Sequence, residues 1–198
     1  EVTETLTAIA ERALVHAQRV LTAAFEARYG VPRNAAGERQ ELIVIGMGKL
    51  GGGELNLGSD VDLCFFHETD DAQVDGSDRT VIEVYSRVVS ATAKALADVT
   101  EDGFCFRVDL RLRPEGDAGP LTRSLESYEN YYAQWGQTWE RMMLIKARGV
   151  AGSESLAGER VKAHIFDFKS CEHLDAKCYR VFIRFKQLTS SAGAAVFS

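Results

Sequence analysis

The chain has 198 residues, of which 45% are hydrophobic and 26% charged, and its formal net charge is −6. This composition suits a globular domain with a core of its own, with or without an appendage. The acidic balance disfavours an extended nucleic-acid groove, and neither a membrane-spanning apolar run nor a signal peptide is visible. We therefore expect a cytoplasmic protein that binds neither long nucleic acids nor membranes.

Residues 1–40 are predicted to form a long helix followed by a polar linker. Apolar residues recur at helical spacing from Leu6 to Phe25, and Gly30 and Pro32 would end the helix. Such a stripe is more typical of a core-facing helix than of a partner surface. We expect a catalytic domain over residues 41–152 and a C-terminal extension, 153–198, whose sequence shows no clean periodicity.

A glycine-rich segment, residues 46–53, follows a short apolar run that predicts a buried strand over residues 42–45. Glycines let backbone N–H groups approach a phosphate closely, and a lysine within the segment adds a positive charge. A serine shortly afterwards could line the same phosphates. The expected phosphate-binding residues in this part of the chain are Lys49, Gly51, Gly52 and Ser59.

Two better-known motifs do not fit this segment. Residues 46–51 match G-x-G-x-x-G, but the dinucleotide fingerprint needs a full crossover helix before the next strand. Here the next apolar run begins directly after Asp62, which is too soon. The P-loop needs Ser or Thr after its lysine, whereas Leu50 follows Lys49.

Two aspartates, Asp60 and Asp62, lead into that second apolar run, residues 63–66. On a strand, side chains at i and i+2 point to the same face. Adjacent carboxylates repel each other unless a positive charge lies between them, and Mg²⁺ with substrate phosphates suits such a pair. We therefore expect Asp60 and Asp62 to be metal ligands in a site for phosphoryl or nucleotidyl groups.

Residues 81–99 are predicted to form a helix, and residues 104–114 a half-buried strand, because their apolar positions recur with helical and with two-residue spacing. The polar face of this strand carries Asp109 among three arginines. Surface ion pairs would explain an isolated strand of this kind. Beside the two aspartates it would instead supply a third metal ligand, with Arg111 and Arg113 on phosphate oxygens and Arg107 in a less defined role.

The later part of the chain gives two further expectations. Residues 125–148 are predicted to form one long helix, which Gly136 would bend. One side of this helix is rich in Tyr and Trp and is expected to face the core. Near the C-terminus, Cys171, His173 and Cys178 are spaced like three zinc ligands, but without a C-x-x-C pair the simpler interpretation is reduced cytosolic thiols.

Two long motifs resemble one known family. They are Gly-Met-Gly-Lys-Leu-Gly-Gly-x-Glu-Leu-Asn-x-x-Ser-Asp-x-Asp-Leu, starting at Gly46, and Val-Asp-Leu-Arg-Leu-Arg-Pro, starting at Val108. The resemblance, over about residues 41–152, is to glutamine synthetase adenylyltransferase, a bifunctional adenylyl-transferring and adenylyl-removing enzyme. It implies the α+β nucleotidyltransferase fold of the DNA polymerase β superfamily, a small mixed sheet flanked by helices, with a long aromatic helix after the catalytic sheet.

The resemblance also implies a chemistry and partners. Two Mg²⁺ ions would be held by Asp60, Asp62 and Asp109, with ATP or ADP as the nucleotide and Asp109 as the natural general base. Glutamine synthetase would be the protein substrate. The PII signal-transduction protein would be a partner through the full-length enzyme.

Family members carry two such domains, which differ in direction. Residues 116–121 and the residues Trp135, Gly136, Trp139, Glu140 and Arg141 look more like the N-terminal, adenylyl-removing half. We therefore expect phosphorolytic removal of AMP from a tyrosine of glutamine synthetase. ATP-dependent adenylylation and a non-catalytic binding remnant remain alternatives, the latter because Gly53 stands where the family usually has arginine. The long match disfavours a small-molecule nucleotidyltransferase.

Overall fold

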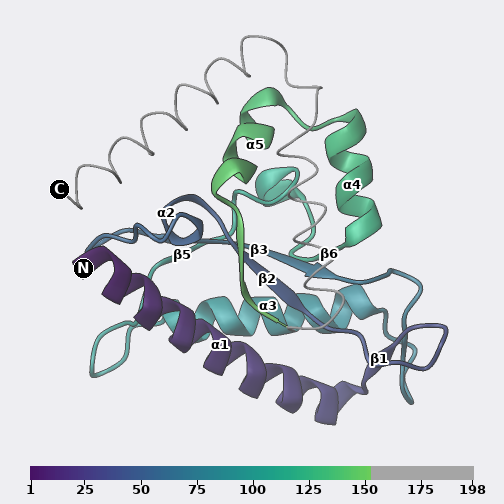
Figure 1. Ribbon diagram of the computed structural model, residues 1–198. Helices are drawn as coiled ribbons and strands as arrows, with labels where there is room; N and C mark the ends of the chain where they lie inside the picture. Colours follow the sequence, from purple (N-terminus) through teal and green to yellow (C-terminus); the bar gives the residue numbers. More distant parts are fainter. Residues whose placement is uncertain (153–198) are drawn as a thin grey trace.

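A mixed β-sheet lies between two groups of helices in the computed structural model, which describes residues 1–152 (Figure 1). The strands β2 (Ile43–Gly46), β3 (Val61–His67), β5 (Val108–Asp109) and β7 (Arg148–Ala151) are ordered β5-β3-β2-β7, and β6 (Arg123–Ser124) also pairs with β3. Strand β3 is antiparallel to β2 and parallel to β5 and β6. A second, two-stranded sheet joins β1 (Pro32–Arg33) to β4 (Gln73–Val74).

The alternation of side chains along β3 divides the core into two layers. Leu63 and Phe65 pack with α1 (Val2–Tyr29) and α3 (Val81–Ala97) on one face of the sheet. Cys64 and Phe66 pack on the other face, beneath α4 (Leu125–Gln134), α5 (Thr138–Met143) and the short 3₁₀ helix η2 (Leu144–Lys146) (Figure 1). The predicted α+β class with a small mixed sheet and flanking helices is confirmed.

The predicted N-terminal helix is confirmed, and it belongs to the main core. Ala10 and Leu14 are buried in the same cluster as the sheet, whereas Ile9 and Val20 are half exposed, so the buried stripe is narrower than the sequence suggested. The helix ends at Gly30, whose φ of +101° is readily adopted by glycine but not by residues with a side chain. A Cβ there would lie only 2.0 Å from the Asp75 carbonyl oxygen.

The predicted strand over residues 104–114 is wrong in length, because only Val108–Asp109 pairs in the sheet. After Asp109 the backbone turns, and the Arg113 guanidinium donates to the carbonyls of Leu110, at 2.6 Å, and Gly119, at 3.2 Å. These bonds close a loop that takes the chain away from β3. Phe104, expected in the core, is more than half exposed.

The long aromatic helix is interrupted between α4 and α5. Helix α4 ends at Gln134, and the backbone of Gly136 then lies so close to Tyr132 that a Cβ would be 2.7 Å from its ring. A new helix begins after Gln137, whose backbone amide donates to Glu140 Oε2 at 2.7 Å. Tyr128 and Tyr132 are buried as expected, but the two tryptophans are not. Trp135 is 70% exposed and Trp139 is 58% exposed.

Strand β7 was not predicted. It pairs antiparallel with the free side of β2 and brings Arg148 beside the glycine-rich segment, where its guanidinium donates to the Leu50 and Gly51 carbonyls. Cys171, His173 and Cys178, interpreted as reduced thiols and a histidine and not as zinc ligands, lie with the rest of the 153–198 extension outside the described residues. No helix within residues 1–152 has the length and apolar character needed to cross a membrane.

Candidate functional site

The glycine-rich segment connects β2 to β3 through a single helical turn, α2 (Gly48–Gly51). Gly46 lies opposite Leu63 in an antiparallel register, and the Met47 amide donates to the Asp62 carbonyl at 2.9 Å. A dinucleotide-binding unit requires two parallel strands joined by a crossover helix. The antiparallel pairing therefore excludes that interpretation, as the sequence spacing predicted.

Two glycines in this segment allow close approaches that a side chain would prevent. Gly48 has φ +51°, and a Cβ there would lie 2.6 Å from Asp62 Oδ2. A Cβ on Gly51 would lie 2.1 Å from the Lys146 carbonyl oxygen. Gly48 thus lets the Asp62 carboxylate lie against the start of α2, and Gly51 lets α2 lie against the chain that leads into β7.

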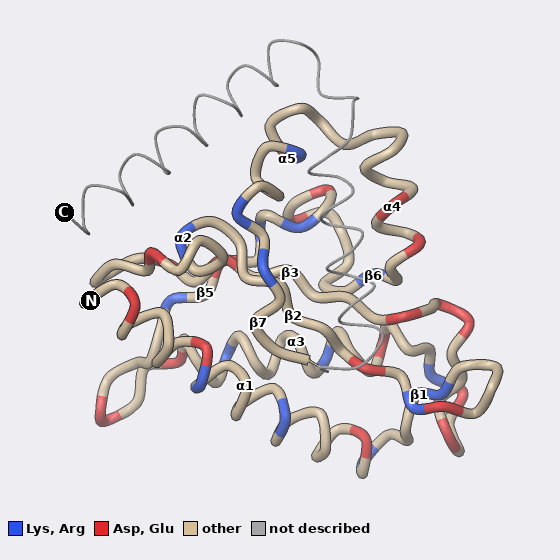
Figure 2. The backbone as a smooth tube through the Cα atoms, viewed as in Figure 1, with Lys and Arg blue, Asp and Glu red and all other residues tan. Residues whose placement is uncertain are grey.

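A cavity of about 480 Å³ opens between α2 and the start of β3. Lys49 and Ser59 both line it, and Lys49 Nζ donates to Ser59 Oγ at 3.3 Å. Figure 2 shows basic and acidic positions close together in this region, around α2 and β5. The complete lining is Gly48, Lys49, Asn56, Leu57, Gly58, Ser59, Asp60, Asp62 and Arg107.

The three aspartates of the predicted site are brought to neighbouring strands. Asp62 is the parallel-register partner of Asp109, and Asp60 immediately precedes β3. The pKa of Asp62 is raised to about 6, first by burial and then by the negative charges of Asp109 and Asp60, against the smaller lowering effects of Arg111 and Lys49. Asp62 therefore lies in the field of both other carboxylates.

Asp60 and Asp109 each face an arginine. Arg107 Nε lies 2.7 Å from Asp60 Oδ1, but this buried oxygen receives no hydrogen bond of favourable angle from the described residues. Arg111 Nε lies 3.0 Å from both oxygens of Asp109, and the Arg111 amide donates to Oδ1 at 2.8 Å. These hydrogen bonds from Arg111 lower the pKa of Asp109.

The side chains at this site are of the type that binds a divalent cation, but they are not arranged as a complete coordination sphere. The donors are carboxylate oxygens, which Mg²⁺ prefers, and Asp62 forms no ion pair with Lys or Arg among residues 1–152. Within the described part of the chain, however, no three acidic, His or Cys side chains converge as a ready metal site. The two outer carboxylates are engaged by arginines instead.

The other predicted phosphate-binding residues differ in their exposure and in their contacts. Gly52 lies at the end of α2, where a Cβ would contact the Lys146 side chain at 3.2 Å. Arg111 is exposed and joined to Asp109, whereas Arg113 is held by the two carbonyls of its own loop. Sequence reasoning gave Arg107 no clear role, although it contacts Asp60. The only available signal was its place on the polar face of residues 104–114.

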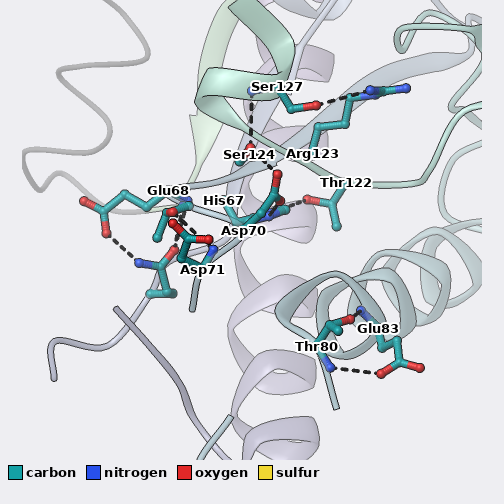
Figure 3. A network of polar contacts seen from close by, with 12 residues as sticks. His67, Glu68, Asp70, Asp71, Thr80, Glu83, Thr122, Arg123, Ser124 and Ser127 are labelled. Carbon is teal, nitrogen blue, oxygen red and sulfur yellow. Dashed lines mark hydrogen bonds and ion pairs between the residues drawn. The ribbon is translucent and has the colours of Figure 1, made fainter. Parts of the chain in front are cut away.

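A second polar network lies at the other end of β3 (Figure 3). The His67 ring is fully buried, with Nδ1 3.0 Å from Thr122 Oγ1 and Nε2 2.8 Å from Asp70 Oδ1. Ser124 donates to the other oxygen of Asp70 at 2.7 Å and accepts from the Ser127 amide, which caps α4. Because the Ser124 hydroxyl is directed at Asp70 and not at the imidazole, this cluster lacks the order of a nucleophilic triad.

The mixed sheet, the glycine-rich turn and the carboxylates at the start of β3 and the end of β5 define a nucleotidyltransferase-like domain. The family model described as glutamate-ammonia ligase adenylyltransferase matches residues 1–163. The chain therefore belongs to the glutamate-ammonia ligase adenylyltransferase family, which confirms the resemblance seen in its motifs.

Known relatives agree with this assignment. A protein of Aromatoleum aromaticum is 45% identical over 181 residues, covering 89% of this chain and 19% of the relative. Proteins of Burkholderia mallei and Vibrio parahaemolyticus are 47% and 40% identical, covering 81% and 83% of this chain and 18% of each relative. All three are named bifunctional glutamine synthetase adenylyltransferase/adenylyl-removing enzyme. The chain spans less than a fifth of their length.

Proposed function

We propose that this chain is a metal-dependent nucleotidyltransferase domain that removes AMP from an adenylylated tyrosine of glutamine synthetase in the cytoplasm, with inorganic phosphate as the acceptor. The observation that carries the proposal is the position of Asp62, which lies opposite Asp109 in the sheet and experiences the negative charges of both Asp109 and Asp60. Family membership and the names of the relatives support the substrate. The Trp135–Arg141 region supports the direction.

Asp60, Asp62 and Asp109 would hold Mg²⁺ through their carboxylate oxygens. The bound cation would supply positive charge that offsets the repulsion between two phosphorus-bearing anions. Gly48 contributes by leaving room for the Asp62 carboxylate. Because the direction of transfer does not alter this need, the carboxylates serve removal and attachment of AMP equally.

The cations around the cavity would bind the phosphate oxygens. Lys49 and Ser59 lie together on its wall, and the backbone of Gly51 and Gly52 closes the turn behind them. Arg111 is exposed next to Asp109 and suits the incoming phosphate. Arg113 would act mainly by fixing the loop that follows β5, and through its charge.

The reaction forms one bond and breaks one bond at the α-phosphorus. An oxygen of inorganic phosphate attacks this atom, the bond to the tyrosine oxygen breaks, and ADP leaves. The tyrosine oxygen takes up a proton and becomes a free hydroxyl. Asp109, once released from Arg111, would accept a proton from the attacking phosphate, and this proton balances the one taken up by the tyrosine oxygen.

The test is to incubate the chain with adenylylated glutamine synthetase and Mg²⁺, with and without phosphate, and to measure the mass of the tyrosine peptide and the ADP formed. We expect loss of AMP and formation of ADP only with phosphate and Mg²⁺ together. A parallel incubation of unmodified glutamine synthetase with ATP tests the opposite direction. AMP addition there would reverse the assignment, and nucleotide binding without either reaction would favour a binding domain.

A further inference from the structure

Arg107 is the one site cation that joins the cavity wall to a proposed metal ligand within residues 1–152. Its Nε lies 2.7 Å from Asp60 Oδ1, and its guanidinium also donates to the carbonyl oxygen of Gly58. Both Asp60 and Gly58 line the cavity. Arg107 therefore lies at the position where a cation bound to Asp60 would be needed.

The contact between Arg107 and Asp60 is suited to exchange. The Arg107 side chain is 61% exposed and that of Asp60 is 44% exposed, so water screens the pair. The Asp60 oxygen that faces Arg107 is buried yet lacks a well-aligned hydrogen bond. A structural ion pair would satisfy this oxygen, whereas this one leaves it available to a better ligand.

We propose that Arg107 is a resident counter-ion that a divalent cation displaces from Asp60, and that the freed guanidinium then binds the phosphates of the nucleotide. The proposal rests on the proposed metal-dependent function and adds a residue to it. It accords with the directions of the two outer carboxylates. Asp60 is directed toward Arg107, as Asp109 is toward Arg111.

The exchange gives Arg107 two opposite effects. It competes with the cation for Asp60, and it assists the nucleotide once the cation is in place. Loss of Arg107 should therefore tighten metal binding and weaken nucleotide binding. A residue that only supports the loop would, when removed, weaken both.

The experiment uses the full chain with Mn²⁺ as the probe and measures free Mn²⁺ by electron paramagnetic resonance, without nucleotide. Arg107→Gln should bind Mn²⁺ about three- to fivefold more tightly than wild type, because an exposed ion pair no longer has to break. Lys49→Gln is the matched control. This variant also removes one positive charge from the cavity, but Lys49 contacts Ser59 and not a carboxylate, so no metal ligand is freed. It should change Mn²⁺ affinity by less than about twofold.

A second measurement determines the affinity for ADP at saturating Mn²⁺. Arg107→Gln should bind ADP about tenfold more weakly, because a charge-assisted contact to phosphate is lost. Circular dichroism and thermal unfolding would verify that both variants are folded.

The outcomes separate the two proposals. If wild type binds Mn²⁺ but Arg107→Gln does not bind it more tightly, the exchange is overturned and the metal-dependent function stands. The same holds if Lys49→Gln gains as much Mn²⁺ affinity as Arg107→Gln. Unchanged ADP affinity in Arg107→Gln also overturns the exchange. If wild type and Arg107→Gln both fail to bind Mn²⁺, the proposed function and the exchange are refuted together.

Discussion

The two ends of β3 carry polar groups in contrasting states. At its beginning, Asp60 and Asp62 stand beside an open cavity, with their charges only partly balanced. At its end, His67 is fully buried and both ring nitrogens have partners, in a network that reaches Ser124 at the cap of α4. One strand thus holds a set of mutually repelling carboxylates and a set of satisfied hydrogen bonds.

This difference indicates that the polar groups at the beginning of β3 serve ligand binding, whereas those at its end serve the stability of the fold. A buried polar group with all its partners stabilises one arrangement of the chain. Carboxylates whose negative charges raise the pKa of a neighbouring carboxyl group, as they do for Asp62, cost stability, and such clusters gather where a ligand supplies the missing charge. The beginning of β3 should therefore tolerate neutralisation without unfolding, and its end should not.

The largest expected effect is on activity at the beginning of β3. Asp62→Asn should reduce AMP removal by about a thousandfold or more, since it deletes a ligand charge. In the absence of metal its free energy of unfolding should equal or exceed that of wild type, because repulsion from Asp109 and Asp60 is relieved. Product formation and chemical denaturation would be measured in parallel. Retained activity would remove Asp62 from the mechanism, and a clear loss of stability would contradict the contrast between the two ends.

A pair of glycine variants tests how closely the carboxylate must be placed. Gly48 and Gly53 both have positive φ, +51° and +73°, so alanine at either position costs about 1–2 kcal/mol. At Gly48 the new Cβ would collide with Asp62 Oδ2, whereas at Gly53 it meets no atom within 4 Å. Gly48→Ala should lower activity by about ten- to a hundredfold, and Gly53→Ala by much less. Equal activities at matched fractions of folded protein would show that the position of Asp62 does not matter.

Substitutions that remove hydrogen bonds from the network at the end of β3 should instead lower the stability of the protein. Ser124→Ala removes the cap of α4 and the hydrogen bond to Asp70 at 2.7 Å, and should cost about 2–3 kcal/mol. Thr80→Ala is the matched control, because Thr80 caps α3 at an exposed position through one such bond and should cost about 1 kcal/mol. Urea unfolding gives both values. A Ser124→Ala cost no larger than the control would mean that the bond to Asp70 adds nothing.

The contrast between the two ends could be anticipated only in part from sequence. The places of Asp60 and Asp62 follow from local alternation, and Val61 and Leu63 are buried as that alternation predicts. The pairing of Asp60 with Arg107 depends on the parallel register of β3 and β5, which alternation does not specify. That the three aspartates share one ion stays a prediction.

The errors have common physical causes. Residues 104–114 alternate well, but bonds from Arg113 to nearby carbonyls turn the chain out of the sheet after two paired residues. The aromatic segment has continuous apolar spacing, but α4 ends at Gln134 and the Gly136 backbone turns back against Tyr132, where a Cβ would not fit. In both cases a tertiary or turn contact overrides a periodic pattern. The His67 network was missed because its two parts, residues 67–70 and 122–127, are far apart in the sequence.

The smallest predicted effect concerns the pH dependence of stability at the end of β3. Burial lowers the pKa of His67, against the raising effect of the Asp70 carboxylate. A folded-state pKa below the unfolded value of about 6.5 means that the unfolded chain binds more protons between the two values. The stabilising contribution of neutral His67 is therefore complete above about pH 6.5 and is lost as the pH falls toward the folded-state pKa.

Wild type should thus lose stability more steeply than His67→Gln as the pH falls below about 6.5, because in this variant a polar side chain that cannot be protonated replaces the imidazole. Each unit of pKa lowering corresponds to about 1.4 kcal/mol. The measurement is urea unfolding at several pH values with EDTA present, taking the difference between the two proteins at each pH, so that other titrating groups cancel. A difference that instead shifts in favour of wild type as the pH falls through about 6.5 would show that His67 is protonated in the folded protein, held by Asp70 as an ion pair. The end of β3 would then be a second charged site, and the contrast between the two ends of the strand would fail.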